Sequence, residues 1–219
     1  MKIDKNIINI LKNFSQNSLS LSVKKGNKIG VISESRNTIA ESYLPVPFER
    51  DFAVYDLSKL ISCLSMFSSP ELTFQKTYVT IGDDNRSINY MYVDEDLINK
   101  CVIPEHKLTI EPQVAEFNIT AQNLKDAEKA LSVLSVPNIV FEGKSGVLKM
   151  IVCDVKTASG NTFEIDVGET DKVFKAIFLA ENIKIINDDY RIVLGQGVSK
   201  FYGNIIEYWI RYDHQSVMG

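Results

Sequence analysis

The sequence contains few of the residues from which metal sites and disulfide frameworks are built. Its 219 residues include three cysteines and two histidines. Cys63, Cys101 and Cys153 are far apart in the chain, and His106 and His214 lack a cysteine or carboxylate at the spacing of a metal-ligand motif. The sequence therefore predicts no metal, no disulfide framework and no cofactor. Free thiols are typical of a reducing compartment.

Long apolar runs and an excess of positive charge are also absent. No stretch approaches the about 18 consecutive apolar residues of a membrane-spanning helix, and the opening MKIDKNIINI is amphipathic, unlike a secretion signal. We therefore expect a cytoplasmic protein that does not associate with membranes. The 24 Lys and Arg residues are outnumbered by 28 Asp and Glu residues, which gives a net charge of -4. This balance argues against tight binding of nucleic acid through many neutralised phosphates.

The pattern that is present is a helix followed by strands, used four times. With 45% apolar residues, the chain has ample material for a core. The spacing of apolar residues predicts short amphipathic helices at residues 4–15, 56–67, 120–135 and 179–186. Strand-like segments separated by turn residues follow each helix. Asp4, Asp56 and Thr120 are suitable N-cap residues for the first three helices.

The periodicity fades between residues 94 and 116, which indicates a linker between two halves. The predicted fold class is therefore α+β, with two similar domains of two helices packed on antiparallel sheets. The expected N-terminal domain is residues 1–110, including a connector at about 94–115. The expected C-terminal domain is residues 111–219.

Three stretches of the sequence resemble DNA polymerase sliding clamps, in particular the trimeric clamps of T-even-like bacteriophages. They read KNIINILKNF, DFAVYDLSKLISCLSMF and FLAENIKIINDDYRIVLGQGVSKFYGNIIEYWIRY. The resemblance implies the DNA clamp fold and a non-catalytic, head-to-tail homotrimeric ring with helices lining a hole for double-stranded DNA. It also implies an ATP-driven clamp loader, a replicative DNA polymerase recruited through a short peptide, and support for late transcription.

The helix faces opposite the apolar stripes carry mainly lysines and amides. The residues expected to face DNA are Lys5, Asn9, Lys12, Lys59, Gln122, Lys125, Lys129 and Lys184. Such flexible groups contact phosphate without reading base sequence. If a ring encloses the duplex, topology prevents dissociation, so a negative net charge is compatible with this function. The alternative is that each face is an ordinary solvated helix surface.

Two further surfaces are expected from the resemblance. Edge strands at residues 86–92 and 161–167 are the expected subunit contacts, with Ile88, Tyr90, Phe163 and Ile165 as candidates. The alternative is an edge covered within the chain. The expected pocket for a partner peptide is formed by apolar connector residues, namely Val102, Ile103, Pro104, Leu108 and Ile110. These residues could instead pack on their own domains.

Two other classes of protein remain as hypotheses: an α+β enzyme with a site assembled from dispersed residues, and an interaction scaffold that uses edge strands without encircling DNA. The acidic pairs Asp83-Asp84 and Asp188-Asp189 lie between strand-like runs, where Asp stabilises turns. Gly143–Gly146 and Gly195–Gly197 also lie between strands. Because neither opens a helix, we interpret them as hairpin turns and not as phosphate-binding loops.

Overall fold

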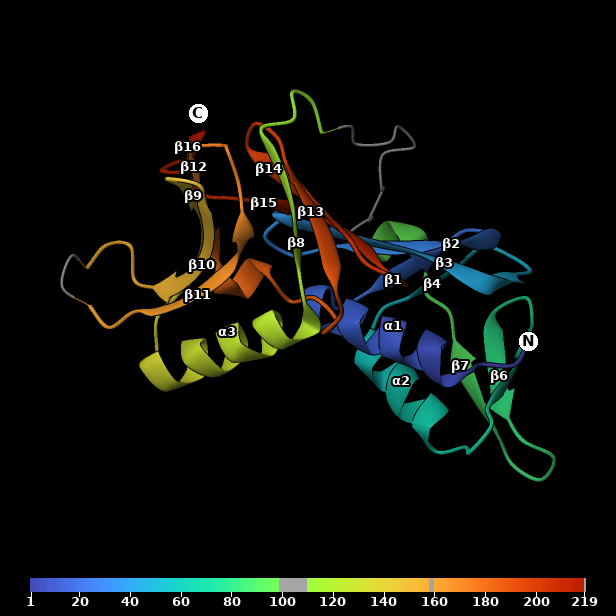
Figure 1. The fold of residues 1–219 in the computed structure, drawn as a ribbon. Helices are drawn as coiled ribbons and strands as arrows, with labels where there is room; N and C mark the ends of the chain where they lie inside the picture. Colours follow the sequence, from blue (N-terminus) through green and yellow to red (C-terminus); the bar gives the residue numbers. More distant parts are fainter. Residues whose placement is uncertain (99–109, 158–159, 219) are drawn as a thin grey trace. The chain divides into compact units, whose positions relative to one another are not determined.

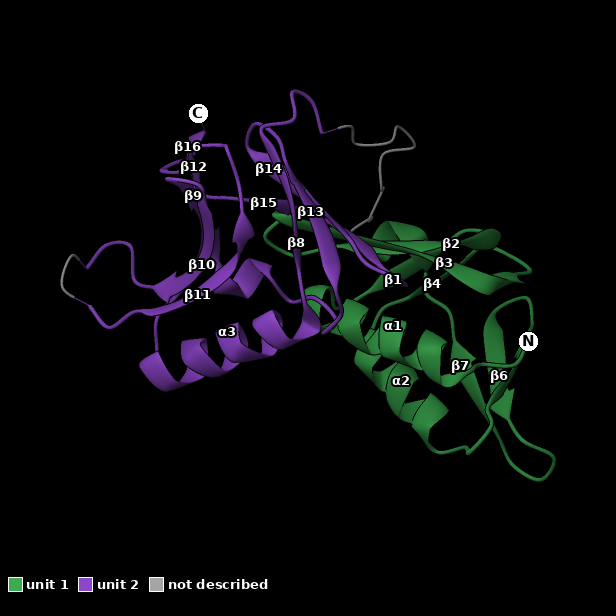
Figure 2. Cartoon of the chain, viewed as in Figure 1, with its two compact units in different colours: residues 1–105 green, residues 106–219 purple. Residues whose placement is uncertain are grey.

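The computed structural model describes residues 1–98, 110–157 and 160–218 (Figure 1). The chain divides into two compact units, an N-terminal unit of residues 1–105 and a C-terminal unit of residues 106–219 (Figure 2). Across the described ranges, the α-helices are α1 (Lys5–Asn17), α2 (Leu57–Ser65) and α3 (Ala121–Leu134). All strand pairs within each unit are antiparallel, so the fold is α+β, as predicted.

The N-terminal unit combines α1 and α2 with short antiparallel strand groups. Its strands are β1 (Leu21–Val23), β2 (Gly26–Ile32), β3 (Thr38–Phe48), β4 (Phe52–Val54), β5 (Glu71–Phe74), β6 (Tyr78–Gly82) and β7 (Ser87–Met91). β1 pairs with β4, β2 pairs with β3, and β5, β6 and β7 form a three-stranded sheet in that order. A 3-10 turn, η1 (Glu95–Leu97), ends the described part of this unit.

The C-terminal unit consists of two antiparallel sheets and α3. Its elements are β8 (Ala115–Ile119), β9 (Asn138–Lys144), β10 (Val147–Cys153), β11 (Phe163–Glu169), β12 (Phe174–Leu179), η2 (Ala180–Asn182), β13 (Tyr190–Leu194), β14 (Val198–Tyr202), β15 (Glu207–Arg211) and β16 (Val217–Met218). One sheet has the order β11-β10-β9-β12-β16. In the other, β8 pairs with β13, β13 with β14, and β14 with β15.

Aromatic side chains fill the space between these two sheets. Phe117 on β8 lies 5.1 Å, between ring centroids, from Phe141 on β9. Phe178 on β12 packs edge-to-face on Phe201 of β14 at 5.9 Å. Such contacts add about 0.5–1.5 kcal/mol each to the burial of the rings. α3 lies beside β10 and β11 (Figure 1), so its apolar face is covered by strand residues.

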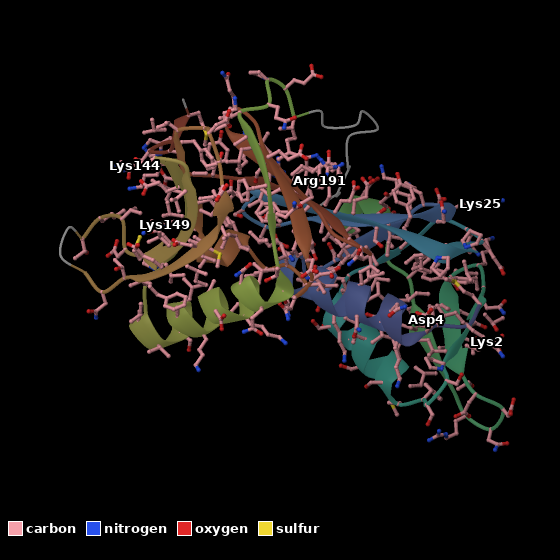
Figure 3. All side chains as sticks on the ribbon, viewed as in Figure 1. Lys2, Asp4, Lys25, Lys144, Lys149 and Arg191 are labelled. Atoms are coloured by element: carbon pink, nitrogen blue, oxygen red, sulfur yellow. The ribbon has the colours of Figure 1, made fainter. Side chains whose placement is uncertain are left out.

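The three α-helices begin at the predicted caps. Asp4 accepts a 2.8 Å hydrogen bond from the backbone N–H of Ile7, at the start of α1 (Figure 3). Asp56 accepts a 2.8 Å bond from the N–H of Lys59. At α3, the Thr120 Oγ1 accepts from the N–H of Asn123, and the Asn123 Oδ1 accepts from the N–H of Thr120 at 2.9 Å. This is a reciprocal capping box.

The fourth predicted helix, residues 179–186, is wrong. β12 runs to Leu179, and only the 3-10 turn η2 follows, without a side-chain cap. Leu179 pairs with Asn138 on β9 and a bend begins at Asn187, so strand pairing leaves only a short segment between them, too short for a stable helix. The expectation of two helices in each domain is therefore corrected: within the described residues, the C-terminal unit has α3 alone.

Candidate nucleic-acid interface and partner surfaces

The exposed faces of α1 and α2 carry lysines and amides without carboxylates. Neither helix contains an Asp or Glu residue. On α1, Ile7, Ile10, Leu11 and Phe14 are buried. The predicted DNA-facing residues Lys5, Asn9 and Lys12 of α1 and Lys59 of α2 are all exposed. Because α1 and α2 pack against each other, these faces belong to one helical layer of the N-terminal unit.

The helix lysines differ from most lysines and arginines on the strands in having no ion pair. In the described part of the chain, no carboxylate pairs with the exposed residues Lys5, Lys12, Lys59, Lys125 or Lys129. On the strands, ion pairs are common: Lys28 with Glu41 at 2.9 Å, Lys149 with Glu164 at 2.9 Å, and Lys200 with Glu207 at 2.7 Å. The helix ammonium groups are therefore available to an external anion.

The helices also lack acids where acids would stabilise them. Apart from the caps themselves, none of the three helices has an acidic residue in its first turn. A carboxylate at such a position contributes about 0.3–1 kcal/mol through the helix dipole. The caps of α1 and α2 are themselves carboxylates, Asp4 and Asp56, so the positive charge of these two helices lies on their exposed lysines and not at their starts.

The exposed face of α3 is more mixed than those of α1 and α2. Gln122, Lys125 and Lys129 are exposed, as predicted. However, the Gln122 side chain donates a 3.0 Å hydrogen bond to Asp126, and Glu128 is exposed at the side of the face. The two lysines at the centre of the face carry its positive charge.

Lys184 does not lie on a helix. It is exposed, but it follows η2 in the segment where the fourth helix was expected. The predicted placement of Lys184 on a helix face is therefore wrong.

The two strands expected at the subunit interface lie at sheet edges. β7 ends the three-stranded sheet and β11 ends the five-stranded sheet. Ile88, Tyr90, Phe163 and Ile165 are half-buried, and the residues that alternate with them on each strand are exposed. The four apolar side chains thus face their own units, and each edge offers its backbone groups and its exposed polar side chains.

Tyr90 is held on the inner side of β7. Its hydroxyl donates a 2.8 Å hydrogen bond to the backbone carbonyl of Asp56. Burial, together with the nearby Asp56 carboxylate, raises the pKa of Tyr90 to about 12. The phenol is therefore a neutral donor near neutral pH, and it ties β7 to the start of α2.

Most of the predicted partner pocket lies outside the described residues. This applies to Val102, Ile103, Pro104 and Leu108. The remaining member, Ile110, is half-buried, and a Cβ on Gly195 would lie 2.6 Å from its Cγ2 atom. Ile110 therefore packs on the turn between β13 and β14, and only a glycine at position 195 leaves room for it.

A groove in the N-terminal unit was not predicted. It has a volume of about 620 Å³ and is lined by the α1–β1 turn, Glu34, Tyr55 and the η1 region. Leu19, Tyr55 and Leu97 are 51%, 54% and 73% exposed there. Sequence reasoning missed it because the apolar residues come one at a time from separate segments. Only the exposed single apolar positions could have drawn attention to it.

The acidic pairs form turns. Asp83 accepts hydrogen bonds from the backbone of Asn85 and Arg86 and pairs with the Arg86 guanidinium at 2.8 Å, and this pairing lowers the pKa of Asp83. Asp188 accepts hydrogen bonds from the backbone and side chain of Asn204, at 3.1 and 2.8 Å. Both carboxylates hold turns between strands, as the sequence indicated.

The described ranges lack the features of a membrane-spanning helix and of a metal site. They contain no helix long and apolar enough to cross a membrane. Outside the gaps at 99–109, 158–159 and 219, no cluster of three His, Cys, Asp or Glu residues is arranged to hold a metal ion.

Solved structures of clamps share this fold. A. fulgidus PCNA, bound to the C-terminal region of FEN-1, superimposes with a TM-score of 0.73 at 12% identity, covering 98% of each chain. PCNA from Thermococcus kodakaraensis gives 0.71 at 16% identity, covering 97% of this chain and 99% of that one. The DNA polymerase III beta subunit of Pseudomonas aeruginosa gives 0.66 at 12%, covering 100% and 64%. These likenesses show that the chain has the clamp fold.

Sequence comparison points to the same family. A family model described as "gp45 sliding clamp, C terminal" matches residues 116–213. The sliding clamp of Enterobacteria phage T4 is 22% identical, covering 99% of this chain and 98% of the relative. The sliding clamp of Vibrio phage KVP40 is 30% identical, covering 96% of this chain and 98% of the relative. The chain therefore belongs to the sliding-clamp family and is a clamp of the phage type.

Proposed function

We propose that the chain assembles into a closed ring that encircles duplex DNA, slides along it and tethers a replicative DNA polymerase, without catalysing a reaction. The observation that carries this proposal is the set of exposed, unpaired lysines on α1, α2 and α3. These residues are Lys5, Lys12, Lys59, Lys125 and Lys129. They occur in a chain whose net charge is -4.

Weak contacts with phosphate suit a clamp. Each phosphate neutralised by a tightly bound cation adds about 0.9 to the steepness with which affinity falls as salt rises. Tight neutralisation would also resist movement along the duplex. A few solvated lysines on flexible stems can exchange phosphate partners at low cost, since their charges are strongly hydrated. An overall negative charge keeps other surfaces from holding DNA.

We propose that the ring is a homotrimer whose subunits join head to tail through β7 and β11. Both are edge strands with backbone groups available for pairing. Pairing two different surfaces is a heterologous contact, which closes into a ring when the rotation between subunits permits. The three-stranded sheet of one subunit would then continue into the five-stranded sheet of the next. In this proposal the clamp domains are residues 1–110 and 111–219.

Partner proteins are proposed to dock near the connector. The solved complex of A. fulgidus PCNA with the C-terminal region of FEN-1 supports a peptide from a partner as the ligand. The proposed pocket includes Ile110, with Val102, Ile103, Pro104 and Leu108. The polymerase would bind there, and an ATP-driven clamp loader would open the ring. Late-transcription factors are further proposed partners, and the bacterial host cytoplasm is the proposed location.

The test of the proposed function is retention on DNA of defined topology. The purified chain is incubated with an ATP-driven clamp loader from a related phage and with either nicked circular DNA or the same DNA linearised, and then filtered through a gel column. We expect the chain to stay with the circle and to run off the linear form. Equal retention on both forms would support a scaffold that binds DNA without encircling it. If the chain is retained on neither form of the DNA, whether or not the loader is present, the clamp function is contradicted.

A further inference from the structure

The C-terminal residues fold back along the outer side of β12. The backbone N–H of Asp213 donates a 2.7 Å hydrogen bond to the carbonyl of Ile177. The N–H of Ile177 in turn donates to the Ser216 Oγ at 2.9 Å. The next residue, Val217, belongs to β16, which pairs antiparallel with β12 and places Val217 opposite Lys175. We call residues 213–218 the tail cap.

The tail cap covers the backbone groups through which β12 could add another strand. In an antiparallel ladder, successive residues direct their N–H and C=O groups to opposite neighbours. On β12 one neighbour is β9. The backbone N–H and C=O groups of Lys175 and Ile177 therefore point away from β9. On that side, both residues pair with the tail cap. This edge of the sheet has no outward group left at these two positions.

The opposite edge of the same sheet is uncovered. β11 pairs with β10 on one side, and no strand of the described residues pairs with it on the other. β11 is seven residues long, so it offers a much longer edge than the two-residue β16. Among the described residues, the sheet thus has one edge covered by the tail cap and one edge without a paired strand.

We propose that the tail cap is an assembly-specificity element, which prevents a second copy of this chain from adding at β12 and so directs strand addition to β11. This inference rests on the proposed head-to-tail assembly. A protomer with two open edges on one sheet could add copies at either, which produces open chains or aggregates in place of a closed ring. The tail cap is short, Val217 is 63% exposed, and residues 213–218 contribute no side chain to the buried apolar core.

Truncation after Tyr212 tests the proposal. The full chain and the variant of residues 1–212 are compared by sedimentation velocity across a hundredfold range of concentration. We expect the full chain to form one closed species and the variant to form additional, larger species. The same mass distribution for both proteins overturns the proposal.

A second set of variants works at the level of single amides, in case the truncated chain does not fold. Val217→Pro removes the N–H that pairs with Lys175, and Ser216→Ala removes the acceptor for the Ile177 N–H. His214→Ala is the matched control, because it lies in the same segment but its side chain is 89% exposed and contacts Asp213 of the tail cap itself. Hydrogen exchange at the amides of Lys175 and Ile177 is measured by NMR.

We expect exchange at Ile177 to rise about tenfold in Ser216→Ala and at both amides in Val217→Pro, since a hydrogen bond of this kind contributes about one factor of ten. His214→Ala should leave both rates unchanged. Val217→Pro should also form the larger species of the truncated chain. Unchanged rates, or faster exchange without larger species, overturn the role of the tail cap. A full chain that stays monomeric contradicts the proposed ring. Hydrogen exchange in the variants still reports on the contacts of the tail cap in that case, so the failure of the ring and the failure of the tail-cap proposal can be told apart.

Discussion

The Tyr90 hydroxyl donates its hydrogen bond to the carbonyl of Asp56, the residue whose side chain caps α2. An edge strand proposed for subunit contact is therefore tied to the start of a helix proposed for DNA contact. One residue, Asp56, uses its carboxylate for the helix and its backbone for the strand. The position of β7 and the start of α2 consequently depend on each other within the N-terminal unit.

Tyr90→Phe should lower stability by about 1 kcal/mol, since it removes one hydrogen bond and leaves the Asp56 carbonyl without that donor. The pKa of Tyr90 is raised from 10.0 to about 12 in the folded chain. Its contribution is therefore fully present below pH 10 and is lost as the pH rises from 10 towards 12. Urea unfolding between pH 8 and 11.5 measures this. The variant should lose stability less steeply above pH 10 than the parent chain, and parallel curves would contradict the assignment.

Replacing Lys5, Lys12, Lys125 and Lys129 together by Ala should weaken retention on circular DNA and leave assembly unchanged. Each phosphate contact removed should reduce the salt dependence of DNA association by about 0.9. The charge-matched control replaces four exposed lysines outside the helices, Lys25, Lys76, Lys144 and Lys156 (Lys25 and Lys144 are labelled in Figure 3). Filter binding over a salt series, with sedimentation to check mass, measures both effects. An equal loss of DNA retention in the two variants would mean that net charge, and not the position of the lysines on the helices, determines DNA association.

A charge placed on β7 should change assembly according to its sign. Asn89 is exposed on β7, and Glu164, Asp166 and Glu169 are exposed on β11. Asn89→Asp puts a like charge near these acids in the proposed interface, at a cost of about 0.2–1 kcal/mol for each pair. It keeps the side-chain oxygen that accepts from the Thr80 hydroxyl. Sedimentation equilibrium should show weaker assembly for Asn89→Asp and no weakening for Asn89→Lys. Identical behaviour of the two variants would place the interface elsewhere.

Thr120→Ala should destabilise the C-terminal unit by about 1 kcal/mol, because the first turn of α3 loses its capping box. Ser132→Ala, at an exposed position on the same helix, is the control and should change stability by less than about 0.5 kcal/mol. Chemical denaturation followed by circular dichroism gives both values. A cost for Ser132→Ala equal to that of Thr120→Ala would mean that capping does not account for the difference.

Local signals account for the parts of the fold that were predicted from the sequence. Asp4, Asp56 and Thr120 each mark a helix start within one residue, because a cap and an apolar stripe lie close together in the chain. The exposure of Lys5, Lys12, Lys125 and Lys129 follows from helical geometry in the same way. These predictions needed no knowledge of tertiary contacts.

Non-local contacts decided the parts that were not predicted. β3 was not recognised as a strand, and it contains Pro45 and Pro47, which are unusual inside sheets. Leu179 was expected to open a helix, whereas it ends β12 and pairs with Asn138 on β9. The groove beside η1 likewise joins residues distant in the sequence.

The loop that replaces the expected fourth helix has its shape set by two tyrosines. The N–H of Ile186 donates to the Tyr208 hydroxyl at 3.1 Å, and the Tyr190 hydroxyl donates to the Ile186 carbonyl at 2.7 Å. A helix would satisfy such groups from its own backbone, whereas this loop depends on side chains anchored in β13 and β15. Insertions or deletions in residues 183–189 are therefore constrained by the reach of two phenol rings, and this surface can change its sequence more freely than its length.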